Sequence, residues 1–110
     1  MATTTYKVLG QSNPSATTLT TLYTVPSATS AVVSTITIAN QSATAATYRV
    51  SIRVAGAADT AKQYVAYDIS LPGNATDTLT LGVTLAATDV ISVYTSSANV
   101  SFNAFGSELS

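Results

Sequence analysis

Apolar and polar residues alternate over short stretches of the chain, and the spacing that would indicate a helix is hard to find. The clearest alternation runs over residues 48–54. One side carries the apolar set Tyr48, Val50, Ile52 and Val54, and the other side carries Arg49, Ser51 and Arg53. Successive side chains of a strand point to opposite faces, so this pattern predicts an antiparallel strand with one face on a core and one in water.

Seven further stretches show the same period, and turn-forming residues separate them. They cover residues 4–9, 18–25, 31–39, 63–71, 77–81, 90–95 and 99–105, and the segment 82–89 is predicted to be a loop. About eight short strands with turns between them predict an all-β protein. The expected form is a single antiparallel β-sandwich, jelly-roll or immunoglobulin-like, and a barrel is the alternative.

The phase of the alternation assigns apolar side chains to faces. In residues 31–39 it groups Val32, Ile36 and Ile38 on one face, and Val33, Thr35 and Thr37 on the other. In residues 63–71 the in-phase set is Val65, Tyr67, Ile69 and Leu71. We therefore predict that Tyr67 belongs to the core and that Tyr64 lies on the opposite, outer face.

Residues 1–110 have the length of one ordinary domain. Residues 1–14 are either an arm that pairs with a neighbouring subunit or an ordinary edge strand, because Pro14 separates them from the rest. The beginning of the chain lacks the apolar run of a secretion signal, and no stretch of about 18 apolar residues is present to span a membrane. We expect the chain to be made in a cytoplasm and not exported by the usual route.

Charged residues make up 8% of the chain and the net charge is −1, whereas an ordinary soluble domain has about 25% charged residues. So neutral a surface suits a subunit of an assembly, although a small and very stable sandwich also tolerates it. Four basic residues cannot neutralise the phosphates that nucleic-acid binding requires. The same shortage disfavours anionic membrane surfaces. A homo-oligomer is the expected state.

Histidine and cysteine are absent from the sequence, which removes the Ser-His-Asp and Cys-His arrangements and the usual zinc ligands. Five carboxylates remain for acid–base work: Asp59, Asp68, Asp77, Asp89 and Glu108. A glycosidase-like pair would need Asp77 and Asp89 to converge within about 5–10 Å. Because Asp59, Asp77 and Asp89 sit in polar turns or at strand ends, we expect them to cap backbone N–H groups instead. No enzyme activity, metal or cofactor is predicted.

Three side chains are candidate inter-subunit contacts. Arg49 and Arg53 are expected on the outer face of their strand, and Tyr64 is the best candidate for an exposed aromatic residue. A sugar-binding aromatic platform is disfavoured, because Tyr64 and Tyr67 are three residues apart on a strand and should point to opposite faces. The absence of tryptophan weakens that reading further.

Three segments together resemble small structural proteins of tailed bacteriophages, cyanophages especially. They are YKVLGQSNP at 6–14, TTLYTVPSATSAVVSTITIAN at 20–40 and LAATDVISVYTSSANVSFNAFGSE at 85–108. A strand with aromatic and basic residues, TYRVSIR, lies between the second and the third. Each motif is a strand or turn pattern and is weak alone, but the shared order covers nearly the whole chain.

The resemblance implies a non-enzymatic virion protein with a β-sandwich fold. The expected role is a capsid decoration (cement) protein that binds the major capsid protein, with a trimer favoured by analogy. The alternative is a tail, collar or fibre-associated protein, which includes a receptor- or glycan-binding module. A hydrolase is the third and weakest hypothesis.

Overall fold

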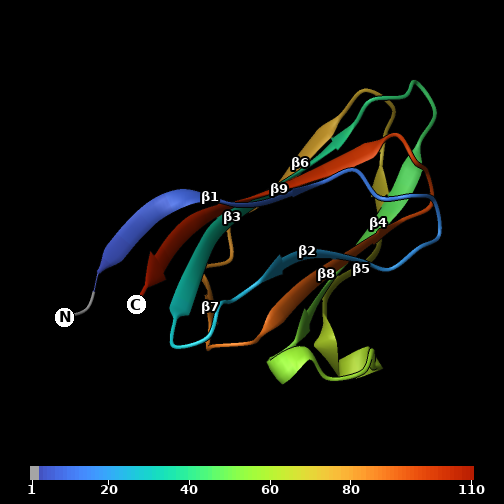
Figure 1. Ribbon diagram of the computed structural model, residues 1–110. Helices are drawn as coiled ribbons and strands as arrows, with labels where there is room; N and C mark the ends of the chain where they lie inside the picture. Colours follow the sequence, from blue (N-terminus) through green and yellow to red (C-terminus); the bar gives the residue numbers. More distant parts are fainter. Residues whose placement is uncertain (1–2) are drawn as a thin grey trace.

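Two antiparallel β-sheets pack face to face in the computed structural model, which describes residues 3–110 (Figure 1). Within these residues the strands are β1 (Thr4–Ser12), β2 (Thr20–Thr24), β3 (Ser30–Asn40), β4 (Ala46–Arg53), β5 (Tyr64–Leu71), β6 (Thr76–Leu79), β7 (Val83–Leu85), β8 (Val90–Thr95) and β9 (Val100–Leu109). Two single-turn 3-10 helices, η1 (Val54–Gly56) and η2 (Ala61–Gln63), lie between β4 and β5. The predicted all-β antiparallel sandwich is confirmed.

The strands divide into two sheets, which we call sheet A and sheet B. Sheet A has the order β1-β9-β3-β6, with β7 also pairing with β3, and sheet B has the order β2-β8-β4-β5. In the described part of the chain the strands therefore number nine, one more than predicted. The additional strand is β7, which forms inside the segment predicted to be a loop. Its three residues pair with Ala31, Val32 and Val33 of β3, so a distant partner and not local alternation determines it.

The core lies between the sheets and takes side chains from both. The largest fully buried side chains include Tyr48, Phe102, Ile36, Ile38, Leu71 and Ile91. Burial of each large apolar side chain contributes about 1.5–3 kcal/mol, which makes this layer the main source of stability.

A β-bulge in β3 overturns the predicted faces of that strand. Val33 opposes Gly106 of β9, but Thr35 opposes Phe105, so Ser34 is one extra residue on β3. An extra residue inverts the alternation on one side of the bulge. Val33 is consequently buried and Val32 is 43% exposed, although Ile36 and Ile38 are buried as predicted.

Two register shifts in β5 overturn the assignment of Tyr67 to the core. Across from β4, Ser51 opposes Tyr64, Val50 opposes Ala66 and Tyr48 opposes Ile69. The first shift accommodates Val65, and the second places Tyr67 and Asp68 together opposite Arg49. Asp68 has a φ of 50°, as expected for a residue in an irregular part of a strand.

The first shift, at Val65, brings Tyr64 and Tyr67 to the same outer face of sheet B. Tyr67 is 56% exposed, and in the predicted inward set only Leu71 is buried. The prediction that the two tyrosines point to opposite faces is therefore wrong. It assumed an unbroken period of two, which one extra residue is enough to reverse.

The faces of β4 largely follow the prediction, with two exceptions. Tyr48 and Val50 are buried, but β4 ends at Arg53, so Val54 belongs to η1 and is exposed. Ser51, expected in water, is fully buried between Tyr64 of β5 and Ser92 of β8.

Two tyrosines connect the sheets through carboxylates. Tyr48 of sheet B packs edge to face against Phe102 of sheet A, with 6.3 Å between ring centroids. Its hydroxyl donates to Asp77 of β6 at 2.9 Å. Tyr23 of β2 donates to Glu108 of β9 in the same way. Burial above all, and then the carboxylate acceptor, raises the pKa of both tyrosines well above its ordinary value, so both remain donors.

The Glu108 contacts predict an acid-dependent loss of stability. Its carboxylate accepts from Tyr23 and pairs with Lys7 at 2.9 Å, and these bonds lower the pKa of Glu108 below its ordinary value, the Tyr23 bond most. A carboxyl with a depressed native pKa stabilises the fold above its unfolded pKa, and this contribution is lost as the pH falls through the native pKa.

We therefore expect Glu108→Gln to lower the free energy of unfolding near pH 7 and to have little effect near pH 3. Urea unfolding of both proteins over this range measures the difference. The other carboxylates are common to both proteins and cancel in the comparison. A deficit that stays constant with pH would show that ionisation of Glu108 is not its source.

One end of sheet A extends beyond the rest of the sandwich (Figure 1). The molecule measures 48 × 27 × 20 Å along its principal axes. We call this end the ribbon: it comprises residues 4–8 of β1, 30–33 of β3 and 106–109 of β9, and both described chain ends lie beside it (Figure 1). Its outer face exposes four apolar side chains, Tyr6, Val8, Val32 and Leu109.

Candidate functional site

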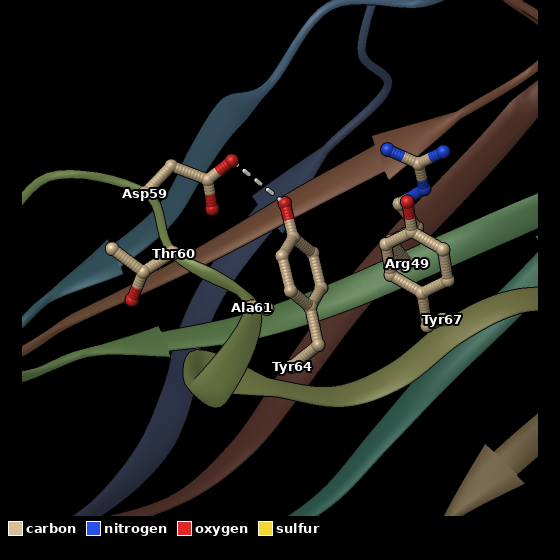
Figure 2. A pocket seen from close by; sticks show the side chains of 6 residues that line it. All are labelled: Arg49, Asp59, Thr60, Ala61, Tyr64 and Tyr67. Carbon is tan, nitrogen blue, oxygen red and sulfur yellow. Dashed lines mark hydrogen bonds between the residues drawn. The ribbon is translucent and has the colours of Figure 1, made fainter.

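Arg49 of β4 and Tyr64 of β5 line one pocket on the outer face of sheet B (Figure 2). The pocket is open and shallow, with a volume of about 520 Å³. Its lining residues are Arg49, Asp59, Thr60, Ala61, Tyr64 and Tyr67. Sheet B forms the floor of the pocket, and residues 59–61, which lead into η2, form one wall (Figure 2).

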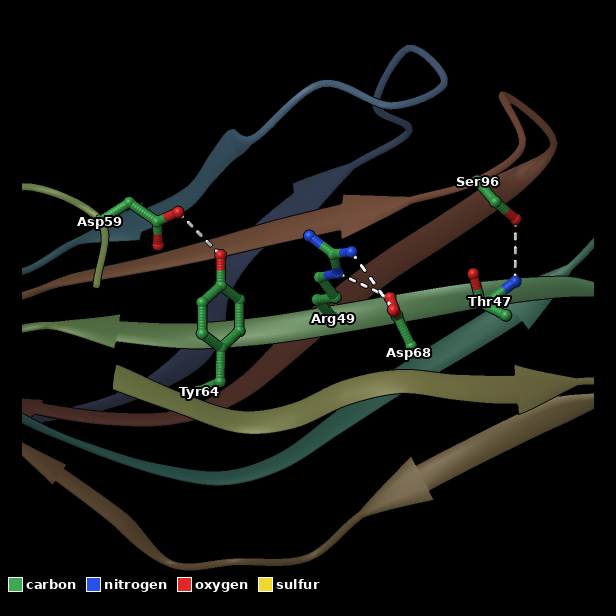
Figure 3. Close-up of polar contacts among 6 residues, drawn as sticks. All are labelled: Thr47, Arg49, Asp59, Tyr64, Asp68 and Ser96. Atoms are coloured by element: carbon green, nitrogen blue, oxygen red, sulfur yellow. Dashed lines mark hydrogen bonds and ion pairs between the residues drawn. The ribbon is translucent and has the colours of Figure 1, made fainter. Parts of the chain in front are cut away.

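Several contacts hold Arg49 in place. Its Nε and Nη2 donate to the two carboxylate oxygens of Asp68 at 2.6 and 3.2 Å (Figure 3). Its guanidinium carbon also lies 4.2 Å from the ring centroid of Tyr67 and 4.3 Å from that of Tyr94. The hydrogen bonds from Arg49 lower the pKa of Asp68. A bidentate pair between two aromatic rings fixes a side chain that would otherwise be mobile.

Tyr64 forms the other side of the pocket. Its ring meets that of Tyr67 nearly at right angles, at 86°, with 5.0 Å between centroids. Its hydroxyl donates to Asp59 at 2.9 Å (Figure 3). Burial first, and then this bond to Asp59, raises the pKa of Tyr64. The two tyrosines and Arg49 thus form a continuous row across β5 and β4.

Arg53 lies outside this pocket. Its Nε donates to the carbonyl of Ala57 at 2.8 Å and its Nη2 to that of Gly56 at 3.1 Å. Its Nη1 donates to the hydroxyl of Ser92 at 3.3 Å. Arg53 therefore fastens the last residue of η1, and the residue that follows it, to sheet B. Arg49 and Arg53 share a strand face, as predicted, but the structure does not bring them into one site.

Sequence reasoning missed several residues of the site, among them Asp59, Tyr67 and Tyr94. Asp59 was expected to cap backbone, Tyr67 was assigned to the core, and Tyr94 was not singled out. A row of tyrosines near two aspartates is a weak signal, and the register shifts of β5 that assemble it have no local mark in the sequence. Tyr94 is placed by pairing, since it opposes Arg49 across β8 and β4.

Asp77 and Asp89 do not form the pair that a glycosidase-like mechanism would require. Asp89 accepts from the backbone N–H groups of Ala55 and Ala86, both at 2.8–2.9 Å, so its predicted capping role is confirmed. Asp59 and Asp77 accept from tyrosine hydroxyls instead. Asp77 is held by Tyr48 near the start of β4 and Asp89 by Ala55 beyond its end. At about 3.3 Å per strand residue they lie on the order of 15 Å or more apart.

Residues 3–110 contain no group of three or more carboxylates arranged to hold a metal ion. No helix among those residues has the length and apolar character needed to cross a membrane.

The ribbon of sheet A is a second candidate surface. β1 stands at the end of the strand order, and each of its residues from Thr4 to Val8 is exposed. An edge strand presents N–H and C=O groups that can pair with another chain, and natural proteins usually block it with lysine, proline or a bulge. Residues 4–8 contain one lysine, Lys7, which is engaged by Glu108. The only bulge in β1 follows Val8.

Comparison with known proteins gives no relative. No family model, no curated protein and no solved structure matches the chain. Function must therefore be inferred from the two surfaces described above.

Proposed function

We propose that the chain is a non-enzymatic structural protein that self-associates through the exposed edge of β1 and binds a bacteriophage particle. The proposed role is capsid decoration, on the major capsid protein, and a place on the tail, collar or fibre is the alternative. The observation that carries the self-association is the unblocked edge of the ribbon. The assignment to a virion rests on the sequence resemblance to small phage structural proteins.

Backbone geometry identifies the groups that would pair with a neighbour. Thr3 and Ser110 exchange two backbone hydrogen bonds, of 2.6 and 3.0 Å. Bonded and non-bonded pairs alternate in an antiparallel ladder. Thr4, Tyr6 and Val8 therefore direct their N–H and C=O groups away from β9 and toward the exposed edge. A strand of another subunit can add there through main-chain bonds.

The side chains of the ribbon favour the same use. Tyr6 is 83% exposed and has Ser107 beside it on β9, with Val32 next on β3. An apolar row beside an open edge supplies contact area as well as hydrogen bonds. The low charge of the chain reduces repulsion between copies. On a capsid, many weakly bound copies gain affinity when each subunit contacts more than one site.

Tyr6→Pro tests the role of the edge. Proline has no N–H, but the N–H of Tyr6 points to the exposed edge, and so the pairing of β1 with β9 should persist. The matched control, Tyr6→Val, keeps the N–H, the strand preference and an apolar side chain. Size-exclusion chromatography with light scattering measures the mass at about 100 µM subunit, well above a micromolar dissociation constant.

We expect wild type and Tyr6→Val to run as trimers and Tyr6→Pro as a folded monomer, with circular dichroism confirming the fold. A wild-type monomer contradicts self-association. A Tyr6→Pro trimer contradicts the use of this edge.

The composition of purified virions tests whether the protein binds a bacteriophage particle. Virions produced by the genome that encodes this chain should contain the protein, as detected by mass spectrometry. Cryo-EM of the same particles should show the sandwich on the capsid surface. Density on the tail would replace the decoration role with the alternative, and absence from purified particles would contradict a virion role altogether.

A further inference from the structure

The pocket on sheet B has the composition of a small-ligand site and lies on the opposite sheet from the ribbon. We infer that it binds a neutral saccharide. The inference rests on the aromatic surface of the pocket, on its polar atoms that have no partner within residues 3–110, and on the arrangement of its charges. Its volume of about 520 Å³ falls within the usual range for small-ligand pockets.

Tyr67 and Tyr64 supply an aromatic surface that is fixed before any ligand arrives. Tyr67 is more than half exposed, yet its ring is held by Arg49 at 4.2 Å and by Tyr64 at 5.0 Å. The C–H groups on one face of a sugar ring carry a small positive charge and pack against the electron-rich face of an aromatic ring. Because the tyrosines are already ordered, binding costs little side-chain entropy.

The polar atoms of the pocket match hydroxyl groups. Arg49 uses Nε and Nη2 for Asp68, and Asp59 uses Oδ2 for Tyr64. Within residues 3–110 no hydrogen bond involves Nη1 of Arg49, Oδ1 of Asp59 or the hydroxyl of Tyr67. These atoms offer a donor, an acceptor and a group that does both. A sugar hydroxyl both donates and accepts, so one ring with several hydroxyls can satisfy all three.

The charges of the pocket select against anionic ligands. Asp59 lines one wall, and the positive charge of Arg49 is already paired with Asp68. An anion would meet the carboxylate of Asp59 and would find no free positive charge. A neutral polyhydroxylated ligand encounters no such repulsion. These charges favour neutral saccharides over phosphates and sialylated glycans.

A glycan array tests the inference with the full-length protein. The probes are neutral glycans built from glucose, galactose, mannose, fucose and N-acetylhexosamines, and sialylated and sulfated glycans serve as charged comparators. We expect neutral glycans to bind and charged glycans of the same core structure to bind more weakly. Titration of the best neutral glycan, followed by NMR, then gives its dissociation constant for wild type and variants.

Three variants identify the site. Tyr67→Ala removes the stacking face and is expected to weaken binding at least about tenfold, as removal of a central aromatic contact does. Tyr67→Phe keeps the ring and should bind within a few-fold of wild type. Tyr6→Ala removes an exposed tyrosine on sheet A, away from the pocket, and should bind as wild type does. Circular dichroism checks the fold of each.

The inference is overturned by any of three results: no neutral glycan binds, charged glycans bind better, or Tyr67→Ala binds as well as wild type. The molecular mass in solution reports self-association independently of glycan binding, so the two proposals can fail separately. Tyr67→Ala should remain a trimer, and Tyr6→Pro should still bind the glycan. A Tyr67→Ala protein that loses both properties would mean that a second copy of the chain, and not a saccharide, covers the pocket.

Discussion

Tyr48→Ala is expected to lower the free energy of unfolding by about 3–5 kcal/mol, the range for removing a large buried aromatic side chain. Tyr48 is 1% exposed and spans the core from β4 of sheet B. The substitution removes its contact with Phe102 and leaves a cavity between the sheets. It also deprives Asp77 of its hydroxyl donor. Because small domains have only about 5–15 kcal/mol of stability, the variant should be marginally folded.

Tyr48→Phe distinguishes the contribution of the ring to stability from that of the hydroxyl. It keeps the packing and removes the bond to Asp77, so we expect a loss of about 1.5–3 kcal/mol, typical of a hydrogen bond to a charged group. Urea unfolding measures both variants, and Tyr6→Phe, which alters an exposed tyrosine, is the matched control with an expected change under about 0.5 kcal/mol.

A double-mutant cycle of Tyr48→Phe with Asp77→Asn then isolates the pair. If Tyr48→Phe is as stable as wild type, or if the two changes are additive, the hydroxyl does not connect the sheets energetically.

The fold class could be read from the sequence because one face of most strands is buried. In β4 the alternation of Tyr48 and Val50 with Arg49 survives intact. A strand with one face on a core must repeat every two residues, and no helix accommodates such a pattern. The prediction thus needed only local spacing. The prediction failed where a strand depends on a distant partner. The three residues of β7 form a strand only because β3 lies beside them.

The faces of β3 and β5 could not be predicted, because bulges are decided by the partner strand. Nothing in residues 31–39 marks Ser34 as the extra residue, yet it determines that Val33 and not Val32 is buried. In β5 the same effect moves Tyr67 from the predicted core to the outer face. The pocket depends on this shift, so the candidate site was hidden from any reading that assumed a regular strand.

The roles of the carboxylates were also only partly predictable. Asp89 bonds to Ala86, three residues away, and a capping role of that kind follows from local turn chemistry. Asp77 is 29 residues from Tyr48, and Glu108 is 85 residues from Tyr23. Such pairs exist only after the two sheets have packed. The sequence indicated the chemistry of these groups but not their partners.

Gly106→Ala is expected to disrupt the ribbon, with a loss of about 3 kcal/mol or more, at or above the upper end of overpacking costs. Gly106 lies on β9 between Lys7 of β1 and Val33 of β3, beside the bulge at Ser34. A Cβ atom there would lie 1.9 Å from the carbonyl oxygen of Val32. The obstacle is backbone and not a flexible side chain, so β3 and β9 would have to separate locally.

Gly82→Ala is the control, because Gly82 is required only for its left-handed backbone conformation and not for a close contact. Gly82 has a φ of 62°, and an added Cβ would meet no atom within 4 Å, so only the left-handed conformation is penalised, by about 1–2 kcal/mol. Urea unfolding should therefore give Gly106→Ala a lower free energy of unfolding than Gly82→Ala. Equal stability of the two variants would contradict the close approach of β9 and β3 at this point.

The same variant connects the ribbon with assembly. β1 is held to the rest of sheet A through β9, so a ribbon distorted at Gly106 should present its edge poorly and associate weakly. Tyr6→Pro should lose association without losing stability, whereas Gly106→Ala should lose both. If Gly106→Ala instead forms normal trimers although it is destabilised, the association surface does not depend on the geometry of the ribbon, and the edge of β1 is not the contact.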